Sequence, residues 1–405
     1  MSDSSRRALA RPPSLFILVC ITLSGTFPLH VFVPALPLAA SELHTSSAGI
    51  GLTITLYVIG LSIGQLIYGP LSDRYGRRPV LLTGLALFVV ASFAAAFAPS
   101  LRSLELARIV QALGGCSGLV LGRAITRDSS GSTMLIRRLA TLSIAMAVAT
   151  AIAPVIGAQF VEHLGWRPIF LALSTVNVLI LGTVWLRVPE THTASREVKV
   201  GLYARSYLQL LRSPAFIAHS LGGASATTGI YAFLSASPFI LEAKFGLSAQ
   251  AFGFAYFSLV VGLASGQSTA KRLAGKVPPR TALIAASLIM CTASASLLVS
   301  WYFDTLTVVG VMAPMIVMFF ATGLSSPFAI SSALDVEPTV VGAAAGLYGC
   351  LQMGYGALCT AAMGLVPANP MLSMIIALIV SSAIAWASFK AVPRAVQAAD
   401  RGSVA

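Results

Sequence analysis

Charged residues are scarce in this 405-residue chain. They make up 10% of it, whereas hydrophobic residues make up 57% and the mean hydropathy is +0.86. A soluble domain typically carries about 25% charged residues. Such a composition excludes a soluble globular protein, because no core of this size could hide so much apolar surface. Lipid must be the solvent for most of the chain.

Motifs for ATP use, metal binding and catalysis are also missing. The sequence has no GxxxxGK[ST] phosphate loop and no HExxH pair. Its five cysteines form no CxxC pair and lie in apolar stretches, as is typical of small buried side chains. We therefore expect no cofactor, no metal site and no enzymatic activity, which leaves secondary transport as the economical function.

Apolar runs of about 20 residues recur along the chain, and each is long enough to cross a bilayer. In lipid the backbone must satisfy its own hydrogen bonds, so a span is a helix or a strand of a closed barrel. These runs are too long and continuous for barrel strands, so the sequence predicts an all-α membrane protein. The twelve predicted helices are 14–38, 47–70, 79–99, 102–126, 137–162, 166–188, 214–241, 249–272, 280–302, 305–331, 339–366 and 370–391.

The formal net charge of +13 would suit a nucleic-acid partner, but the positions of the basic residues argue against one. If the N-terminus is cytoplasmic, nearly all Lys and Arg residues fall on the cytoplasmic side, and only Arg102, Arg167 and Lys244 fall outside. This is the positive-inside pattern of membrane proteins. It predicts cytoplasmic termini, contact with membrane lipid and no nucleic-acid partner.

A polar stretch at 190–212 divides the chain into two similar halves. Gly60-Leu-Ser-Ile-Gly64-Gln65 aligns with Gly262-Leu-Ala-Ser-Gly266-Gln267, about half a chain later. Parallel repeats of this kind occur in secondary transporters. The predicted organisation is a cytoplasmic tail 1–13, a six-helix bundle 14–189, a cytoplasmic linker 190–212, a second bundle 213–393 and a tail 394–405.

The segment between the second and third predicted spans carries a family signature. Gly69 to Pro79 read Gly-Pro-Leu-Ser-Asp-Arg-Tyr-Gly-Arg-Arg-Pro, which resembles the signature loop of the major facilitator superfamily. That resemblance implies twelve transmembrane helices in two pseudo-symmetric six-helix bundles.

Residues of this segment are candidates for gating. Gly69 and Gly76 would allow close approach and a tight turn. The carboxylate of Asp73 would latch the two halves by binding the helix N-terminus near Thr339. The arginines would hold the loop and meet anionic lipid, or they would only set topology: Arg74, Arg77 and Arg78.

Arg108 lies inside a predicted span, where a charge is costly and usually faces a cavity. Arg108 and Gln111 resemble the family's second motif, with Ala112 where glycine is common. Glu105 could pair with Arg108 one turn away. We expect Arg108 and Glu105 to take part in proton coupling, with substrate contact by Arg108 as a further possibility; simple snorkelling to the interface is the alternative.

The first span contains His30-Val-Phe-Val-Pro-Ala-Leu-Pro, which resembles the first helix of the bicyclomycin/chloramphenicol resistance subfamily. His30 stands where that subfamily commonly has an aspartate, a candidate proton carrier. A histidine can also exchange a proton near neutral pH, but it is neutral when empty and positive when loaded. The alternative is a neutral histidine hydrogen-bonded within a kinked helix.

The fifth span contains a proline and a glycine that resemble the antiporter motif of the family. Pro154 and Gly157 would bend this helix and allow tight packing. We expect a role in gating, while a plain structural kink is the alternative.

A central cavity would be lined by aromatic and polar side chains, an arrangement that suits amphiphilic small molecules. No acid lies deep within a predicted span, so neutral or weakly anionic substrates fit better than cationic drugs. The candidate lining residues are Phe27, Tyr57, Gln111, Tyr231, Phe239, Tyr256, Gln352 and Tyr355.

The resemblance implies a monomeric exporter in the bacterial inner membrane that exchanges protons for small amphiphilic, bicyclomycin- or chloramphenicol-like drugs by alternating access. Transport of a metabolite such as a sugar or an amino acid is the first alternative. A membrane enzyme or sensor would need embedded metal ligands, a catalytic constellation or a signalling domain, and the sequence has none.

Overall fold

The computed structural model describes residues 13–129, 132–191, 200–337, 340–364 and 369–392, and within these the secondary structure is helical. The first half comprises α2 (Leu15–Val31), η1 (Val33–Ala35), α3 (Leu36–Glu42), α4 (Ser47–Tyr75), α5 (Arg77–Ala96), α6 (Leu101–Asp128), α7 (Ser132–His163) and α8 (Arg167–Arg187). The linker contains α9 (Val200–Leu211). The second half comprises α10 (Pro214–Pro238), η2 (Phe239–Lys244), α11 (Ala249–Leu273), α12 (Pro279–Tyr302), α13 (Val308–Asp335), α14 (Val341–Met363) and α15 (Pro370–Lys390).

The predicted all-α membrane fold with twelve helices is confirmed. Elements α2, η1 and α3 together form the first span, and α10 continues into η2. In the described part of the chain, ten spans are long and apolar enough to cross a membrane by their own composition. Helices α11 and α14 complete the twelve. Helix α11 packs against α7 and α13, and helix α14 packs against α4 and α10.

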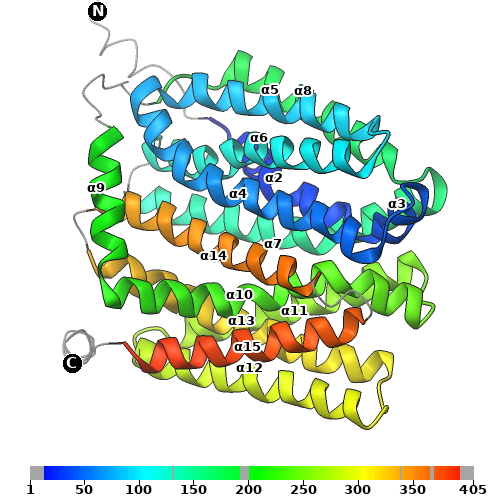
Figure 1. Ribbon diagram of the computed structural model, residues 1–405. Helices are drawn as coiled ribbons and strands as arrows, with labels where there is room; N and C mark the ends of the chain where they lie inside the picture. The colour runs from blue at the N-terminus through cyan, green and yellow to red at the C-terminus, as the bar shows by residue number, and fades with distance from the viewer. Residues whose placement is uncertain (1–12, 130–131, 192–199, 338–339, 365–368, 393–405) are drawn as a thin grey trace, which may run out of the picture.

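The two halves lie one above the other in Figure 1, and α9 crosses one end of the bundle. We call this end the linker side and the other end the far side. Helix α2 begins and α15 ends on the linker side. On the far side, serines cap the starts of several helices: Ser46 on α4, Ser100 on α6 and Ser248 on α11. These caps satisfy backbone N–H groups that a helix leaves unpaired.

The repeat in the sequence corresponds to equivalent contacts in the two halves. Gly60 of α4 packs closely on α6, and Gly262 of α11 packs in the same way on α13. Small residues allow membrane helices to approach in this manner. Arg78 donates from Nη2 to the carbonyl of Trp185 (2.6 Å), and Arg280 likewise donates to Lys390 (3.0 Å). Each basic residue therefore caps the last helix of its own half.

Two boundaries differ from the sequence prediction. The signature segment is helical up to Tyr75, so only Gly76 forms the turn, with φ of +96°. The close approach and turn expected at Gly69 are absent, because it lies inside α4 and no atom is within 4 Å of the Cβ it would carry. In the first span the helix breaks at Val31, next to Pro34 in η1. Proline lacks an N–H donor and interrupts a helix.

Candidate transport site and gates

Arg108 is fully buried on α6 among helices of the first half. Its Nη1 donates to Oε1 of Gln111 (2.7 Å) and to the carbonyl of Pro28 (3.3 Å). In a continuous helix the carbonyl of Pro28 would accept the backbone N–H of Phe32. Helix α2 ends at Val31, however, and the Phe32 N–H donates to the carbonyl of His30 instead. Gln111 is held in turn by its Nε2 donating to Oγ of Ser92 (2.8 Å). The helix break thus provides one of the acceptors for Arg108.

Aromatic rings enclose the guanidinium group of Arg108. Its central carbon lies 4.1 Å from the ring centre of Tyr57, 5.3 Å from that of Phe32 and 5.7 Å from that of Phe170. Tyr57 is fixed because its hydroxyl donates to the carbonyl of Gly25 (2.8 Å). Such cation–π contacts stabilise a desolvated cation by about 2 kcal/mol or more.

The buried charge of Arg108 is only partly satisfied. Its Nε and Nη2 atoms have no hydrogen-bond partner among the described residues. The expected pairing with Glu105 was wrong: no ion pair joins the two in the described structure, and Glu105 is partly exposed whereas Arg108 is fully buried. These two N–H groups of Arg108 can therefore donate hydrogen bonds to an acceptor group that enters this site.

His30 lies between the two halves. Its Nδ1 is 3.1 Å from the hydroxyl of Tyr256 on α11, and both side chains are buried. Tyr256 belongs to an aromatic cluster of the second half with Phe233, Phe252 and Phe319. A single hydrogen bond therefore connects the helix break of the first half to the aromatic core of the second.

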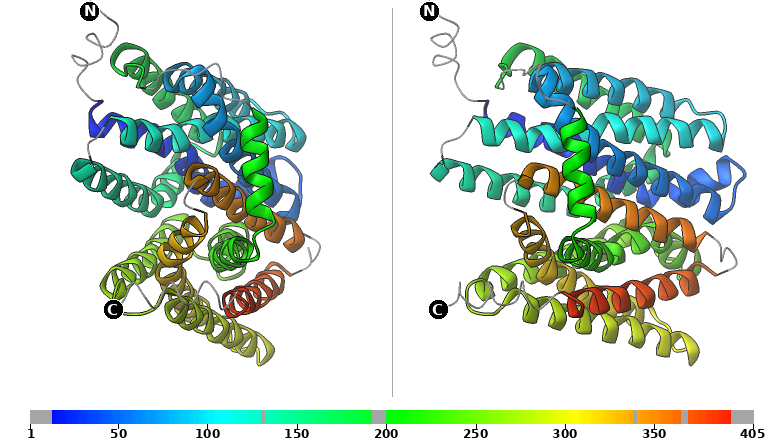
Figure 2. Two further views of the ribbon diagram at one scale, coloured as in Figure 1. Left: turned by 90° about the vertical axis from the view of Figure 1, so that its left-hand side faces the viewer. Right: turned by 60° about the vertical axis from the view of Figure 1, so that its left-hand side comes forward.

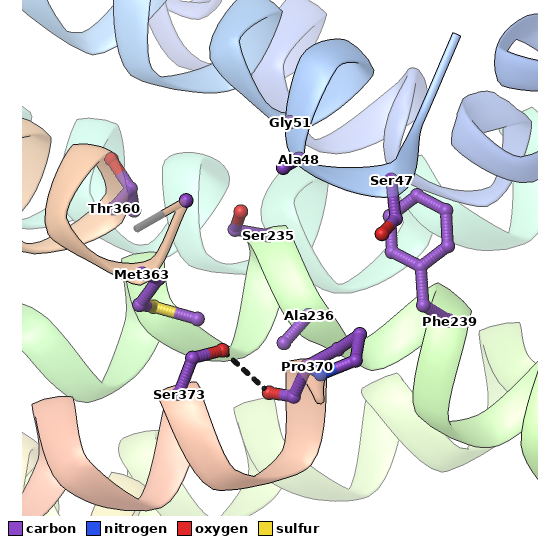
Figure 3. Close-up of a pocket in the computed structure, with 11 residues that line it drawn as sticks. Ser47, Ala48, Gly51, Ser235, Ala236, Phe239, Thr360, Met363, Pro370 and Ser373 are labelled. Carbon is purple, nitrogen blue, oxygen red and sulfur yellow. Dashed lines mark hydrogen bonds between the residues drawn. The ribbon is translucent and has the colours of Figure 1, made fainter. Parts of the chain in front are cut away.

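Contacts between the halves close the far side. The hydroxyls of Thr55 on α4 and Thr360 on α14 are 2.7 Å apart, and Gln250 donates to Glu162 (2.8 Å). Figure 3 shows a small pocket nearby, where Ser47, Ala48 and Gly51 face residues of α10, η2, α14 and α15. Its volume is about 30 Å³. That is room for little more than a water molecule and far less than a drug-sized ligand needs.

Helices α4 and α14 also meet closer to the linker side. The Oγ of Ser62 donates to the carbonyl of Cys350 (2.8 Å) and lies 3.3 Å from its sulfur. Gln65 donates to the sulfur of Met353 (3.2 Å), and its side chain fills the space beside Gly349. A Cβ added to Gly349 would lie 1.9 Å from Oε1 of Gln65, so the Gln65 side chain would have to move.

The signature segment forms a charge network on the linker side. Arg77 is buried and bonds Asp73 of α4 (2.6 Å) and Asp128 at the end of α6 (3.0 Å). It also donates to the hydroxyl of Ser72. The alternative in which arginines only set topology is therefore wrong for Arg77, which binds together the ends of three helices.

Glu190, just after α8, closes the same network. Its carboxylate accepts the backbone N–H groups of Arg77 (2.9 Å) and Arg78 (3.1 Å) at the start of α5. The φ of +96° at Gly76 favours glycine, and a Cβ there would also lie 2.5 Å from this carboxylate, which would have to move. The predicted tight turn at Gly76 therefore occurs, whereas Arg74 is exposed and stacks on the ring of Tyr75.

Comparison with known proteins places this arrangement in a family. The sequence model of the Major Facilitator Superfamily matches residues 15–358. The chain belongs to the Major Facilitator Superfamily.

Similar proteins include drug-resistance transporters, which confirms the resemblance drawn from the sequence. The bicyclomycin resistance protein homolog of Haemophilus influenzae is 26% identical over 382 residues, covering 92% of this chain and 95% of that protein. The chloramphenicol resistance protein of Pseudomonas aeruginosa is 28% identical over 365 residues, covering 88% and 85%.

Among solved structures, the D-xylose-proton symporter superposes with a TM-score of 0.69 at 14% identity, covering 92% of this chain and 97% of that one. At that identity the likeness shows the fold alone. The chain is thus a multi-pass membrane protein and a transporter of this superfamily rather than an enzyme.

The structure brings only some of the predicted cavity residues together. Tyr57, Gln111 and Tyr256 are fully buried at the centre, around Arg108 and His30. Tyr231 packs against Gly356. The others are not part of this group: Phe27, Phe239, Gln352 and Tyr355. The hydroxyl of Tyr355 lies 3.4 Å from that of Ser381 on α15 instead.

Two of these outlying residues line separate grooves between helices. Phe27 lines a groove of about 430 Å³ between α2, α7 and α8. Tyr355 lines one of about 540 Å³ between α4, α10 and α14. Phe27 and Tyr355 therefore do not share one groove in this conformation.

On α7, Pro154 lies inside the helix and Gly157 allows close packing on α2. A Cβ at Gly157 would lie 2.0 Å from the carbonyl oxygen of Val31, at the break of the first span. The close packing expected from the sequence is present here, within the first half.

Several residues that form the site were not predicted from the sequence. Phe32, Phe170 and Ser92 surround Arg108 and Gln111, but in the sequence they are ordinary members of apolar runs. Glu190 and Tyr203 carried weak signals, the first in a Pro-Glu-Thr segment and the second in an amphipathic stretch of the linker. Tyr203 donates a hydrogen bond to Asp73. The predicted partner Thr339 lies outside the described residues.

Proposed function

We propose that this chain exports small amphiphilic drugs across the bacterial inner membrane in exchange for protons, by alternating access. The observation that carries the proposal is the hydrogen bond between His30 and Tyr256, a titratable contact between the halves beside a buried arginine. Relatives named for resistance to bicyclomycin and chloramphenicol support the substrate class.

The linker side is the cytoplasmic side in this proposal, with both termini inside. Basic residues near the ends of α4, α6, α8, α11 and α15 support this orientation, as the positive-inside rule requires. The halves 14–189 and 213–393 move as two bodies joined by the linker 190–212, in a monomer that contacts membrane lipid.

Proton binding at His30 changes the contact between the halves. A protonated imidazole donates from both nitrogens, so Tyr256 can then only accept. The new positive charge lies two residues from Pro28, whose carbonyl binds the guanidinium of Arg108. A second cation in this buried place is costly. Protonation therefore favours separation of the halves and hydration of His30.

Arg108 also indicates the substrate class. Its Nε and Nη2 are free to donate, and aromatic rings line the site. A neutral or weakly anionic amphiphile with a carbonyl or carboxylate group matches both features. Gln111 positions the guanidinium for this contact.

The proposal is tested by drug accumulation in cells with and without the protein, with a protonophore as control. Chloramphenicol accumulation should fall only in energised cells that carry the protein. Cells that carry the His30→Ala variant should accumulate as much drug as cells without the protein. Proton-driven efflux that survives His30→Ala would place the proton carrier elsewhere, and no difference across a broad drug panel would favour the metabolite alternative.

A further inference from the structure

The linker helix α9 touches both halves of the transporter. Figure 2 shows it running across the linker side from the first half to the start of α10. Its tyrosines are spaced four residues apart, so Tyr203 and Tyr207 lie on one face. Their ring centres are 6.4 Å apart.

One end of α9 is anchored in the second half. Leu210 is 1% exposed and belongs to a small apolar cluster with Phe216 of α10 and Leu347 of α14. Beside it, Gln209 donates from Nε2 to the carboxylate of Glu337 after α13 (3.0 Å). Burial and a hydrogen bond together attach this end of α9 to the second half.

The tyrosines of α9 reach the first half. Tyr203 donates its hydroxyl to Oδ2 of Asp73, while Arg77 holds the other carboxylate oxygen. Tyr207 donates to the carbonyl of Leu66 on α4 (3.3 Å). Arg77 in turn binds Asp128, so the acceptor of Tyr203 belongs to a network that is rigid within the first half.

We propose that α9 is a strap across the linker side and that the hydrogen bond from Tyr203 to Asp73 is its latch. The latch holds α4 against the second half and must break whenever the linker side opens. This inference rests on the proposed alternating access but not on the identity of the drug or the proton carrier. The linker then holds the two halves together on this side, in addition to connecting them along the chain.

The chemistry of the latch suits a contact that is independent of pH. Burial, and next the hydrogen bond to the Asp73 carboxylate, raise the pKa of Tyr203. Burial likewise raises the pKa of Tyr207 to about 12. Both hydroxyls therefore remain protonated donors at any physiological pH, so a change of pH in this range does not remove the donors of the strap.

The test measures opening directly. Spin labels on Arg187→Cys and Arg272→Cys, at exposed linker-side ends of α8 and α11, report the distance between the halves in a background without native cysteines. In Tyr203→Phe the ratio of long to short distances should rise about ten- to a hundredfold, the effect of losing one hydrogen bond to a charged group. Tyr75→Phe, which removes an exposed hydroxyl from the same end of α4, should change nothing.

The outcomes separate the latch from the wider proposal. Equal distance distributions in Tyr203→Phe and the labelled parent would overturn the latch. A distance that never lengthens in any variant, with drug or without, would contradict alternating access itself. Tyr207→Phe gives a graded check, because its longer bond to a backbone carbonyl should contribute less than that of Tyr203.

Discussion

Glu190 should stabilise the fold although it lies in no helix. Its carboxylate accepts two N–H groups at the start of α5, where Gly76 offers no side-chain cap. Loss of a helix cap costs about 0.5–2 kcal/mol, and a negative charge at a helix N-terminus contributes about 0.3–1 kcal/mol. Because Glu190 is exposed to solvent, screening reduces the charge term. In Glu190→Gln one acceptor oxygen remains, so we expect a loss of about 1 kcal/mol.

The assay is denaturant unfolding of the purified protein in detergent, in which a lower midpoint at constant slope shows lost stability. Asp304→Asn is the matched control, because it makes the same chemical change in an exposed turn whose left-handed φ of 53° asparagine tolerates. Glu190→Gln with the midpoint of the parent would refute the capping role. An equal fall in Asp304→Asn would show that net charge alone matters.

Two further changes test single features of the structure. Gly76→Ala should lower the free energy of unfolding by about 1–3 kcal/mol, because the backbone conformation favours glycine and the Cβ would meet Glu190. In the same unfolding assay Gly69→Ala should cause no loss, because the space around Gly69 is open. Arg108→Lys keeps the charge but loses the planar donors over Tyr57, so drug efflux should fall about tenfold while the protein still folds. Efflux at the parental rate would show that charge alone suffices at that site.

Much of the fold follows from the sequence because lipid imposes simple rules. Runs of about 20 apolar residues can only be helices, and the repeat of Gly60 and Gly262 reflects equivalent helix packing. The helical extension to Tyr75 was not predicted. Its charged residues indicated a loop, whereas here they continue the helix of the second span beyond the lipid.

The site was less accessible to sequence reasoning. Arg108 could be identified as a site residue from the sequence, because a charge within a span is costly and usually has a function. Its acceptor at Pro28 depends on where α2 breaks, and its rings come from that break, from α4 and from α8, so neither has a local pattern. The contact of His30 with Tyr256 joins residues that are far apart in the chain. Only the packing of the two halves creates it.

The central claim is that the two halves must separate during transport, and one native cysteine allows a direct test. Ser62 Oγ lies 3.3 Å from the sulfur of Cys350 across the interface between α4 and α14. Ser62→Cys therefore places two thiols where a disulfide of about 2.05 Å can form. The other native cysteines are replaced: Cys20, Cys116, Cys291 and Cys359.

Oxidation of this variant should stop drug efflux and reduction should restore it, while the same protein with Cys350→Ser should be unaffected by either treatment. Undiminished efflux by fully cross-linked protein would contradict the separation of the halves and, with it, the transport mechanism proposed for this chain.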